Sequence, residues 1–478
     1  MTRLVVGPFN RVEGDLEVTL DVEDGVVAAA RAGSPLYRGF EQILRGKHPM
    51  DALMFAPRVC GICSVSQSMA AARTLADAMG LAAPANGRIA CNLAHAVENL
   101  ADHFTHFYLF FMPDFARAEY AARPWHARAA ARFKALQGSA TAEVMPARTA
   151  FLTMLGTLAG KWPHTLSIQP GGSARALEAS EKIRLHALLR DFRRHVEATL
   201  FNDALEAVAA LDSAAALSTW AAEKPRGDFG LFLGIADDLA LDQLGRGIGR
   251  FMSYGNYPQE RGLLLPNGVW DGRLQALDAQ VISEDLSHAW MAGETRHPAQ
   301  GLTQPQDGKD DGYTWCKAPR LAGLPMETGA LARQMVAGHP LARDLAGRDG
   351  QCGGSVKSRV VARLLEIALI LPHMEQWVRQ IVPGEPFFAP GEMPDEAAGV
   401  GLVEAARGSL GHWLSVADGR IANYQIISPT TWNFSPRDSD GTPGPLEQAL
   451  VGTPVADGHV AVQHVVRSFD PCMVCTVH

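Results

Sequence analysis

Two cysteine pairs with the same spacing lie near opposite ends of this 478-residue chain. Cys60 and Cys63 belong to the stretch RVCGICSVSQS, and Cys472 and Cys475 to the final stretch, DPCMVCTVH. The two residues between the cysteines of each pair let both sulfurs point at one ion. Because a chain terminus normally frays, metal ligands placed there need a tertiary partner. The sequence therefore favours a fold that joins both ends of the chain in a buried four-thiolate metal centre.

The residues alone leave the metal open. Soft thiolates suit zinc, iron–sulfur, copper(I) and, where the protein imposes the geometry, nickel. Small zinc modules separate their cysteine pairs by about 15–20 residues, whereas Cys63 and Cys472 lie 409 residues apart. A small zinc module is thus disfavoured, while a long-range zinc clip stays open. Thioredoxin-like chemistry is disfavoured because neither pair has a βαβ setting.

The seven cysteines do not form a disulfide framework. Besides the two pairs, the sequence has three scattered cysteines: Cys91, Cys316 and Cys352. Few cysteines and an odd number fit a reducing compartment, where paired cysteines indicate metal or redox chemistry. The N-terminal residues lack the apolar core of a signal peptide, so we expect a cytoplasmic protein, unless a partner exports it.

Composition and charge indicate a large globular protein. Apolar residues make up 47% of the chain and charged residues 20%, which supports an extensive core. The net charge is −8 and the basic residues form no run, so nucleic acid is an unexpected partner. No apolar stretch reaches the roughly 18 residues of a membrane span. Although the length would allow about three domains, we find no boundary and expect one domain over residues 1–478.

Hydrophobic periodicity predicts a mainly α protein with small peripheral β-sheets (α+β). A β-hairpin over about residues 1–30 turns at Asp24-Gly25, and a second hairpin opens a C-terminal region over about 400–478 and turns at Asp418-Gly419. Helical patterns cover residues 65–80, 90–111, 173–211 and 358–382, with Pro372 expected to kink or end the last. Residues 460–466 have the composition of a strand, and residues 387–401 and 438–448 that of loops.

Further motifs follow one another in order along the chain. They are YRGFEQILRGKHPMDA, DHFTHFY, GKWPH, YTWCKAPR, PMETGALARQM, EAARGSLGHW and IANYQIISPTTWN. Together with RxCGxC and the terminal DPCxxCxxH, they strongly resemble the large subunit of nickel–iron hydrogenases over almost the whole chain. The resemblance implies that family's fold, with a central helical bundle, and an enzyme that cleaves H2 heterolytically into two protons and two electrons.

The resemblance also implies the metal ligands. Cys60, Cys63, Cys472 and Cys475 would all bind nickel, and the second cysteine of each pair, Cys63 and Cys475, would bridge to an iron that carries CO and cyanide. Cys60 and Cys472 would be terminal thiolates. One of these accepts the first proton in such enzymes, and we assign that role to Cys472.

Four further residues match family positions beside the metals. Glu13, in RVEGD, corresponds to the glutamate that passes the proton onward, although the residue by itself would be interpreted as an exposed strand-edge carboxylate. Arg407 corresponds to an arginine above the open metal face, where its guanidinium can polarise H2. Asp102 and Asp470 correspond to carboxylates that hold this arginine. Asp102 already stands out, because a carboxylate on an apolar helix face needs a partner.

A second ion is implied near the C-terminus. Glu41 and His478 match ligands of a magnesium or iron ion, with the backbone carbonyl of Ile426 as a third. Oxygen ligands and retained waters are usual for magnesium. The histidine that ends the sequence resembles the mature family form, in which an extension has been clipped off or was never encoded.

Several positions depart from the common family pattern, and three of them, Gln67, Ile62 and Phe110, resemble the hydrogen-sensing, or regulatory, branch. Gln67 replaces a histidine that most members have, Asp15 replaces the histidine of RxEGH, and Ala406 replaces a proline. Glutamine forms hydrogen bonds but does not titrate near neutral pH. Ile62 and Phe110 stand where many relatives have smaller residues, and in the sensor branch such bulk narrows the gas channel against O2.

These resemblances imply partner proteins for the chain and leave more than one function open. The three cysteines outside the pairs are too few for an iron–sulfur cluster with four cysteine ligands, so an iron–sulfur small subunit is expected, in a heterodimer that could itself pair. Our main hypothesis is a cytoplasmic, oxygen-tolerant H2 sensor of low turnover that signals to a histidine kinase. An energy-conserving uptake hydrogenase is the alternative. A nickel-free structural homologue of a respiratory complex, or a zinc protein, is disfavoured because all four cysteines and the other motifs are present.

Overall fold

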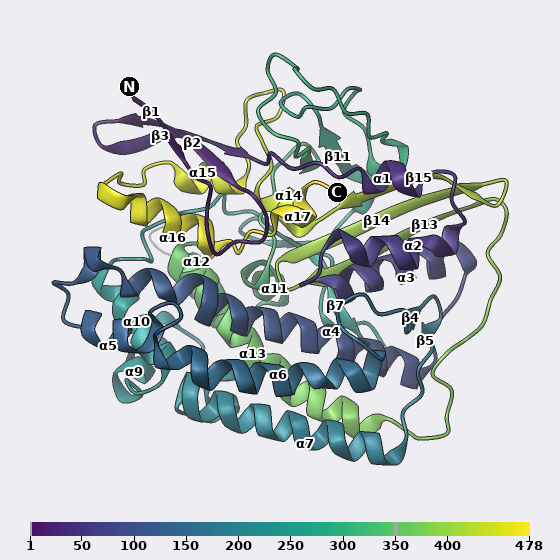
Figure 1. The fold of residues 1–478 in the computed structure, drawn as a ribbon, viewed down its shortest axis with the longest axis horizontal. Coiled ribbons are helices and arrows are strands. Elements are labelled where there is room, and N and C mark those ends of the chain that lie inside the picture. The colour runs from purple at the N-terminus through teal and green to yellow at the C-terminus, as the bar shows by residue number, and fades with distance from the viewer. Residues whose placement is uncertain (1, 348–351) are drawn as a thin grey trace.

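Long helices pack together in one half of the molecule, and short strands with irregular segments occupy the other half (Figure 1). Helix α4 contacts α6 and α13, and α7 contacts the same two helices. Their bounds are Ala85–Thr105 for α4, Ser139–Ala159 for α6, Ala179–His195 for α7 and Val356–Gln380 for α13. The computed structural model describes residues 2–347 and 352–478. A mainly helical body with small sheets confirms the predicted fold class.

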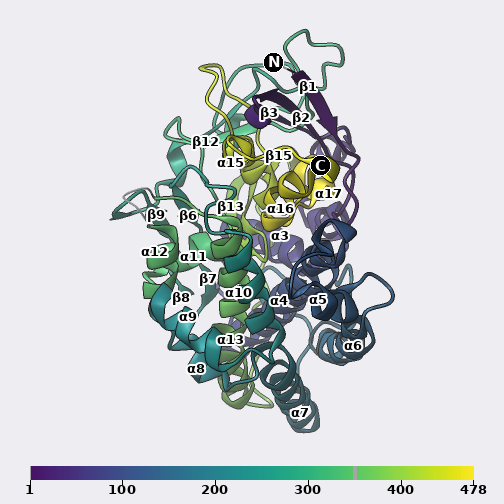
Figure 2. The ribbon, with the colours of Figure 1, turned by 90° about the vertical axis from the view of Figure 1, so that its left-hand side faces the viewer.

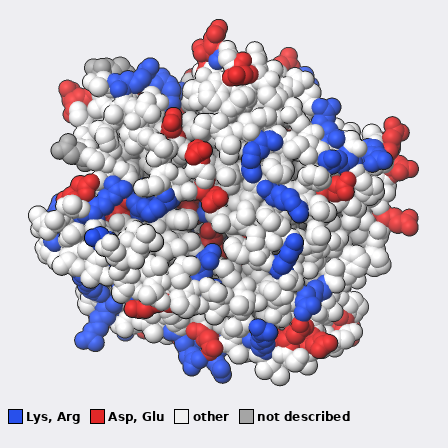
Figure 3. Space-filling model, viewed as in Figure 1, with Lys and Arg blue, Asp and Glu red and all other residues white. Residues whose placement is uncertain are grey.

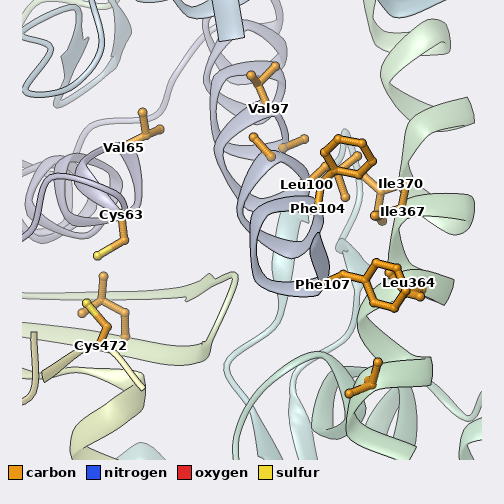
Figure 4. Packing of buried hydrophobic residues seen from close by; sticks show 14 of the residues in the cluster. Cys63, Val65, Val97, Leu100, Phe104, Phe107, Leu364, Ile367, Ile370 and Cys472 are labelled. Atoms are coloured by element: carbon orange, nitrogen blue, oxygen red, sulfur yellow. The ribbon is translucent and has the colours of Figure 1, made fainter. Parts of the chain in front are cut away.

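The interface between α4 and α13 supplies much of the core. Apolar residues three or four positions apart form one face of each helix, and Figure 4 shows these faces meeting. The buried side chains are Val97, Leu100 and Phe104 on α4 and Leu364, Ile367 and Ile370 on α13. Burying a side chain of this size contributes about 1.5–3 kcal/mol. The same cluster continues to the cysteines of both pairs, so the predicted metal ligands lie within the main core.

The N-terminal strands form a three-stranded antiparallel sheet in the order β1-β2-β3. Its strands are β1 (Thr2–Val6), β2 (Glu17–Glu23) and β3 (Val26–Gly33). Asp24 and Gly25 connect β2 to β3 with φ of 49° and 78°, the left-handed geometry that this residue pair supplies in tight hairpins. The predicted N-terminal hairpin is thus confirmed, with β1 as an added edge strand.

The C-terminal hairpin is also confirmed and belongs to a second three-stranded sheet, β13-β14-β15. Strand β13 (Ala397–Ala405) begins inside a stretch predicted to be a loop, and β14 (Gly408–Ala417) and β15 (Arg420–Ile427) meet at the predicted turn. This sheet lies directly against α3 (Ser64–Met79). A Cβ at Gly401 would lie 2.2 Å from the carbonyl oxygen of Ala70, so only glycine allows this approach.

The other helices are shorter: α1 Phe40–Leu44, α2 Ala52–Phe55, α5 His126–Phe133, α8 Leu205–Ala209, α9 Ala214–Glu223, α10 Asp228–Asp238, α11 Ala330–Ala337, α12 Pro340–Ala346, α14 Pro429–Asn433, α15 Pro445–Leu450, α16 Val460–Ser468 and α17 Met473–Thr476. The remaining strands form small two- or three-stranded sheets: β4 Ile168–Gln169, β5 Gly172–Ser173, β6 Phe251–Ser253, β7 Asn256–Pro258, β8 Leu263–Leu265, β9 Gly268–Trp270, β10 Leu274–Gln275, β11 Ile282–Asp285 and β12 Ala318–Leu321.

The strand predicted over residues 460–466 is wrong, because this segment is helix α16. Its valines suggested a strand by composition. Val462, Val465 and Val466 are nevertheless buried at helical spacing, and α16 packs against α13 and α15. Tertiary packing on one apolar face therefore outweighs the local preference of β-branched residues.

Two long helical predictions need smaller corrections. The helix predicted over 173–211 begins only at Ala179, because Ser173 ends strand β5, and it is divided into α7, a π-helical turn (Val196–Phe201) and α8. Asn202, with φ of 53°, ends the first part, as asparagine tolerates the left-handed region. Helix α13 does not end at Pro372 but runs through it. Proline removes one backbone hydrogen bond, and the buried residues on either side keep the helix in place.

The two ends of the chain meet in the tertiary structure. Both ribbon views place the N-terminal sheet beside the C-terminal helices α15 to α17 (Figures 1 and 2), and β3 contacts α15. The face drawn in Figure 3 carries lysine, arginine, aspartate and glutamate side chains mixed over its surface. Within the described residues, no helix is both long enough and apolar enough to cross a membrane.

Candidate metal centre

The four paired cysteines converge in the interior. The Sγ atoms of Cys60 and Cys472 lie 3.5 Å apart, those of Cys63 and Cys475 3.0 Å apart, and those of Cys472 and Cys475 3.3 Å apart. All four sulfurs lie within 4.8 Å of one another. Each side chain is buried, and Figure 4 shows the sulfurs of Cys63 and Cys472 facing each other.

Local structure and one arginine hold the two cysteine loops together. Cys63 is the N-cap residue of α3 and Cys472 that of α17, so each pair stands at the start of a helix. Arg38 donates from Nη2 to the carbonyl oxygens of Val59 and Val474, one in each loop. Sequence reasoning did not identify Arg38 by itself, although it lies within the motif YRGFEQ.

The donor set fits a soft metal ion. Burial raises the pKa of the Cys60, Cys63 and Cys475 thiols. Burial also opposes ionisation of Cys472, but hydrogen bonds from the other thiols and the charge of Arg407 outweigh it and lower the pKa of that thiol. Four buried thiols so close together need a cation to become thiolates, and sulfur prefers soft metals at bonds of about 2.3 Å.

Arg407 lies beside this cluster and contacts both aspartates that the family motif indicated. Its guanidinium donates to the Asp102 carboxylate, with 3.2 Å between Nη2 and Oδ1, and Nη2 lies 3.2 Å from Oδ1 of Asp470. Its Nε donates to the Asp470 carbonyl at 2.9 Å. Burial raises the pKa of Asp102 to about 7, whereas Arg407 outweighs burial at Asp470 and lowers its pKa.

A second buried network, which sequence reasoning missed, fixes the backbone before Arg407. Arg333 forms ion pairs with Glu366 and Glu404, at 2.8 and 2.9 Å. The same guanidinium donates to the carbonyl oxygen of Ala406 at 3.1 Å. Arg333 lies in the motif PMETGALARQM, which resembled the family without suggesting a role. These contacts hold the backbone directly before Arg407, whose charge acts on Cys472.

Glu13 is half-buried and tied to the C-terminal cysteine loop through its backbone. It forms an isolated bridge with Cys472, and its carbonyl oxygen accepts from the Met473 amide at 2.6 Å. Burial and the neighbouring Cys472 charge raise the pKa of the Glu13 carboxyl. The exposed strand-edge position that the residue alone suggested is therefore wrong. Asp15, two residues later, is exposed.

Glu41, His478 and Ile426 also meet. Nε2 of His478 lies 3.3 Å from Oε1 of Glu41 and 2.7 Å from the carbonyl oxygen of Ile426. Nδ1 of His478 lies 2.9 Å from the carbonyl oxygen of Cys475, which links this group to the cysteine cluster. The three predicted ligands therefore face a common point.

Three neighbours of this group were not predicted. Lys317 lies 3.3 Å from Glu41 and 3.2 Å from Glu284, and Thr303 donates to Glu41. Although burial opposes ionisation of Glu41, the Lys317 charge and the His478 contact lower its pKa to about 2. These side chains line a cavity of about 10 Å³, which is space for about one water-sized sphere.

Gln67 takes part in a buried polar chain. Its Oε1 lies 2.9 Å from Nε2 of His412, whose Nδ1 lies 2.8 Å from the Tyr424 hydroxyl. Burial lowers the pKa of His412 to about 3, so this histidine is neutral. Ile62 and Phe110 are both partly buried, and Ile62 packs against the main core.

Glu98 is a buried carboxylate that sequence reasoning missed. It accepts from the amides of Val65 and Ser66 at 2.7 and 2.8 Å, and from Nε1 of Trp162 at 2.9 Å. The first turn of α3, directly after Cys63, is thus attached to α4. Glu98 lies on the same apolar helix as Asp102, so the argument from a buried carboxylate applied to it equally.

Glu98 predicts a pH-dependent stability. Burial raises its pKa to about 7 from a usual 4.5, so the folded state binds the proton more tightly. The stabilisation that protonated Glu98 gives the folded state is complete below pH 4.5 and is lost as the pH rises through 7. We expect this group to lower the unfolding free energy by about 3 kcal/mol between pH 4 and 8, and Glu98→Gln to remove that fall in urea titrations. Exposed Glu260→Gln is the control, and equal pH dependence in Glu98→Gln and the native protein would contradict this.

Comparison with known proteins agrees with this geometry. The family model described as nickel-dependent hydrogenase matches residues 38–141 and 140–478. The periplasmic [NiFeSe] hydrogenase large subunit of Desulfomicrobium baculatum is 30% identical, over 100% of this chain and 95% of that protein. The uptake hydrogenase large subunit of Bradyrhizobium diazoefficiens is 28% identical, over 100% and 95%.

Solved structures give the same result. A reduced, active form of the Ni-Fe-Se hydrogenase from Desulfomicrobium baculatum superposes with a TM-score of 0.84 at 29% identity, covering 100% of both chains. The as-isolated oxidised enzyme of D. vulgaris Hildenborough has the same TM-score, identity and coverage. With the four cysteines gathered as described, the chain belongs to the nickel-dependent hydrogenases, the oxidoreductases that interconvert H2 with protons and electrons, and corresponds over its whole length to their large subunit.

Proposed function

We propose that this chain holds the nickel–iron group of a hydrogenase. Cys60, Cys63, Cys472 and Cys475 would hold the nickel, and Cys63 and Cys475 would also hold an iron that carries CO and cyanide. The observation that carries this proposal is the convergence of four buried sulfurs within 4.8 Å. When bound, the group supplies the site where H2 is polarised and its two electrons are collected.

The side chains around the cluster handle charge and protons. Arg407, held by two carboxylates, places a fixed positive charge beside Cys472. That charge favours the thiolate, which accepts a proton at Sγ. Glu13 is bound to the same loop through its backbone, and its raised pKa suits it to take the proton onward, since efficient proton transfer needs a pKa near the working pH.

Infrared spectroscopy and turnover test this proposal together. Purified protein should show bands from metal-bound CO and cyanide and should reduce a dye under H2. Protein that contains nickel but has neither CO nor cyanide bands would overturn the nickel–iron assignment. Protein that contains zinc instead of nickel would support a structural metal site.

We further propose a magnesium ion bound by Glu41, His478 and the Ile426 carbonyl. Oxygen ligands with retained water suit magnesium, and iron is the alternative. Glu41→Gln is expected to lose this ion and to lower the unfolding free energy by about 3 kcal/mol, because Lys317 loses a buried partner. Elemental analysis and urea titration measure both effects.

Glu284→Gln is the matched control for the ion site. It removes the other carboxylate of Lys317 without touching His478, so it should destabilise the protein but keep the ion. Equal magnesium content in Glu41→Gln and the native protein would contradict the assignment.

We propose that the physiological role is H2 sensing in the cytoplasm, with oxygen tolerance and a histidine kinase as partner. Gln67, Ile62 and Phe110 support this through their resemblance to the sensor branch. An energy-conserving uptake role is the second candidate, and the name of the Bradyrhizobium relative favours it. Slow H2 turnover that persists under O2, with binding to a kinase, would support the sensor, whereas fast, oxygen-sensitive turnover would support uptake.

We also propose an iron–sulfur small subunit as partner and a single domain for this chain. The relatives are named large subunits or large chains, and the main core continues from Phe9 to Cys475. Co-purification of an iron–sulfur protein in a one-to-one ratio tests the partner, and limited proteolysis without a stable fragment tests the single domain.

A further inference from the structure

A fully buried aspartate, Asp114, lies in a short 3₁₀ helix (Met112–Ala116) beyond the π-helical turn that follows α4, and it contacts four basic side chains. Its carboxylate forms ion pairs with Arg11, with Arg117 at 3.0 Å and with Arg467 at 2.7 Å, and Nδ1 of His464 lies 3.5 Å away. Burial opposes its ionisation, but these neighbours lower the pKa of Asp114 well below its usual range. The proposed metal ligands and the residues around Arg407 do not include this group.

One of these cations belongs to the loop that carries Glu13. Arg11 precedes Glu13 by two residues, and its Nη1 also donates to the carbonyl oxygen of Phe110 at 3.0 Å. The Arg11 backbone has φ of 55°, a left-handed conformation that is unfavourable for a residue with a side chain. The two contacts of its guanidinium, to Asp114 and to Phe110, hold the loop in this shape.

A second cation attaches the other side of the same loop. Arg467, at the end of α16, donates from Nη2 to Oδ1 and to the carbonyl oxygen of Asn10, at 2.8 and 3.0 Å. Five residues later the chain reaches Cys472. The loop over residues 10–13 and the segment that leads to Cys472 are therefore both attached to the Asp114 carboxylate. The bridge between Glu13 and Cys472 connects the loop to that segment directly.

We infer that Arg11 is a positioning residue, which holds Glu13 at the distance from Cys472 that proton transfer requires. The inference rests on the proposed function, in which Glu13 takes the proton from Cys472. Arg11 is suited to this because its planar guanidinium contacts two fixed acceptors at once, so it defines the direction of the loop. A displacement of about 1 Å in such a site can cost up to a hundredfold in rate.

The test compares two arginines that bind the same carboxylate. Arg11 and Arg117 both contact Oδ1 of Asp114, and their side chains are 19% and 23% exposed. Arg11→Gln and Arg117→Gln thus remove equivalent charges, but only the first removes contacts that the Glu13 loop itself makes. We expect Arg11→Gln to lower H2-dependent dye reduction per bound nickel by about tenfold, and Arg117→Gln to change it less than about twofold.

A double-mutant cycle separates positioning from general structural damage. Arg11→Gln is combined with Glu13→Gln, and D2–water exchange is measured by mass spectrometry along with turnover. If Arg11 acts through Glu13, the double variant should be no slower than Glu13→Gln alone. The infrared bands should be unchanged in all variants. If Arg11→Gln does not fold, Arg11→Lys, which keeps the charge but lacks the planar guanidinium that spans both acceptors, should show an intermediate loss.

Three results would overturn the inference: full activity in Arg11→Gln, equal losses in Arg11→Gln and Arg117→Gln, or the same further loss when Arg11→Gln is added to Glu13→Gln. Native protein without CO and cyanide bands or turnover would instead refute the proposed function itself. A fully active Glu13→Gln would remove the proton acceptor that Arg11 is inferred to position.

Discussion

Replacing Cys472 with serine is expected to deprive the protein of nickel and to lower H2-dependent dye reduction by about a thousandfold or more. The physical reason is the change of donor: a serine hydroxyl is hard and stays protonated near neutral pH, whereas the proposed nickel site needs soft thiolates. The sulfur of Cys472 lies 3.5 and 3.3 Å from those of Cys60 and Cys475, so its loss opens the centre of the cluster. Elemental analysis and infrared spectra measure the consequence directly.

The chain offers a matched control for this substitution. Cys91 is also buried, but its thiol donates to the carbonyl oxygen of Gly172 at 3.6 Å. Among the described residues, Cys91 is not part of the cysteine cluster. Cys91→Ser should keep nickel, infrared bands and turnover. Full nickel content and turnover in Cys472→Ser would refute the ligand assignment.

Replacing Arg407 with lysine is expected to lower turnover by about a hundredfold while leaving the metals in place. Lysine keeps the charge, but its compact ammonium group lacks the planar, widely spaced donors with which the guanidinium contacts Asp102 and both acceptors of Asp470. The positive charge would therefore move away from Cys472. Removal of one fixed donor from a buried site costs about 10²–10³ in rate.

Arg73→Lys provides the comparison, because Arg73 contacts a single backbone acceptor, the Leu402 carbonyl, at 2.8 Å. We expect turnover within about threefold of the native protein for this variant. The site should also remain visible by its CO and cyanide bands in Arg407→Lys. If Arg407→Lys retained full turnover, the guanidinium geometry would not contribute to the reaction.

Local patterns in the sequence predicted the regular elements well where one face is buried. The two hairpins turn at the predicted Asp-Gly pairs, and α3 ends at Met79, directly before the glycine expected to close it. The segment that became α16 was misjudged because valine favours strands in isolation. Its burial against α13 and α15 is a contact between distant parts of the chain, which a local pattern does not report.

Some residues of the candidate site were likewise predicted from the sequence, and others were found only in the structure. The cysteines, Glu13 and Arg407 stand in motifs that resemble a known family, so their chemistry was predicted before their positions were known. Glu98, Arg333 and Lys317 lie in ordinary helical or strand patterns, or in motifs with no suggested role. Each became notable only through its buried partners, because a charged group in the core must be compensated by groups that the fold brings to it.

The sequence by itself determined which candidate ligands exist and that the two cysteine pairs must meet to form one centre, because CxxC pairs 409 residues apart come together only in a closed fold. Tertiary structure decided which charges surround that centre. Asp102 forms an ion pair with Arg407, while Asp114, farther along the chain, forms ion pairs with Arg11 and Arg467. Residue type and local spacing depend on near neighbours, whereas these pairings depend on how helices and loops far apart in the chain pack, and only the folded molecule sets that.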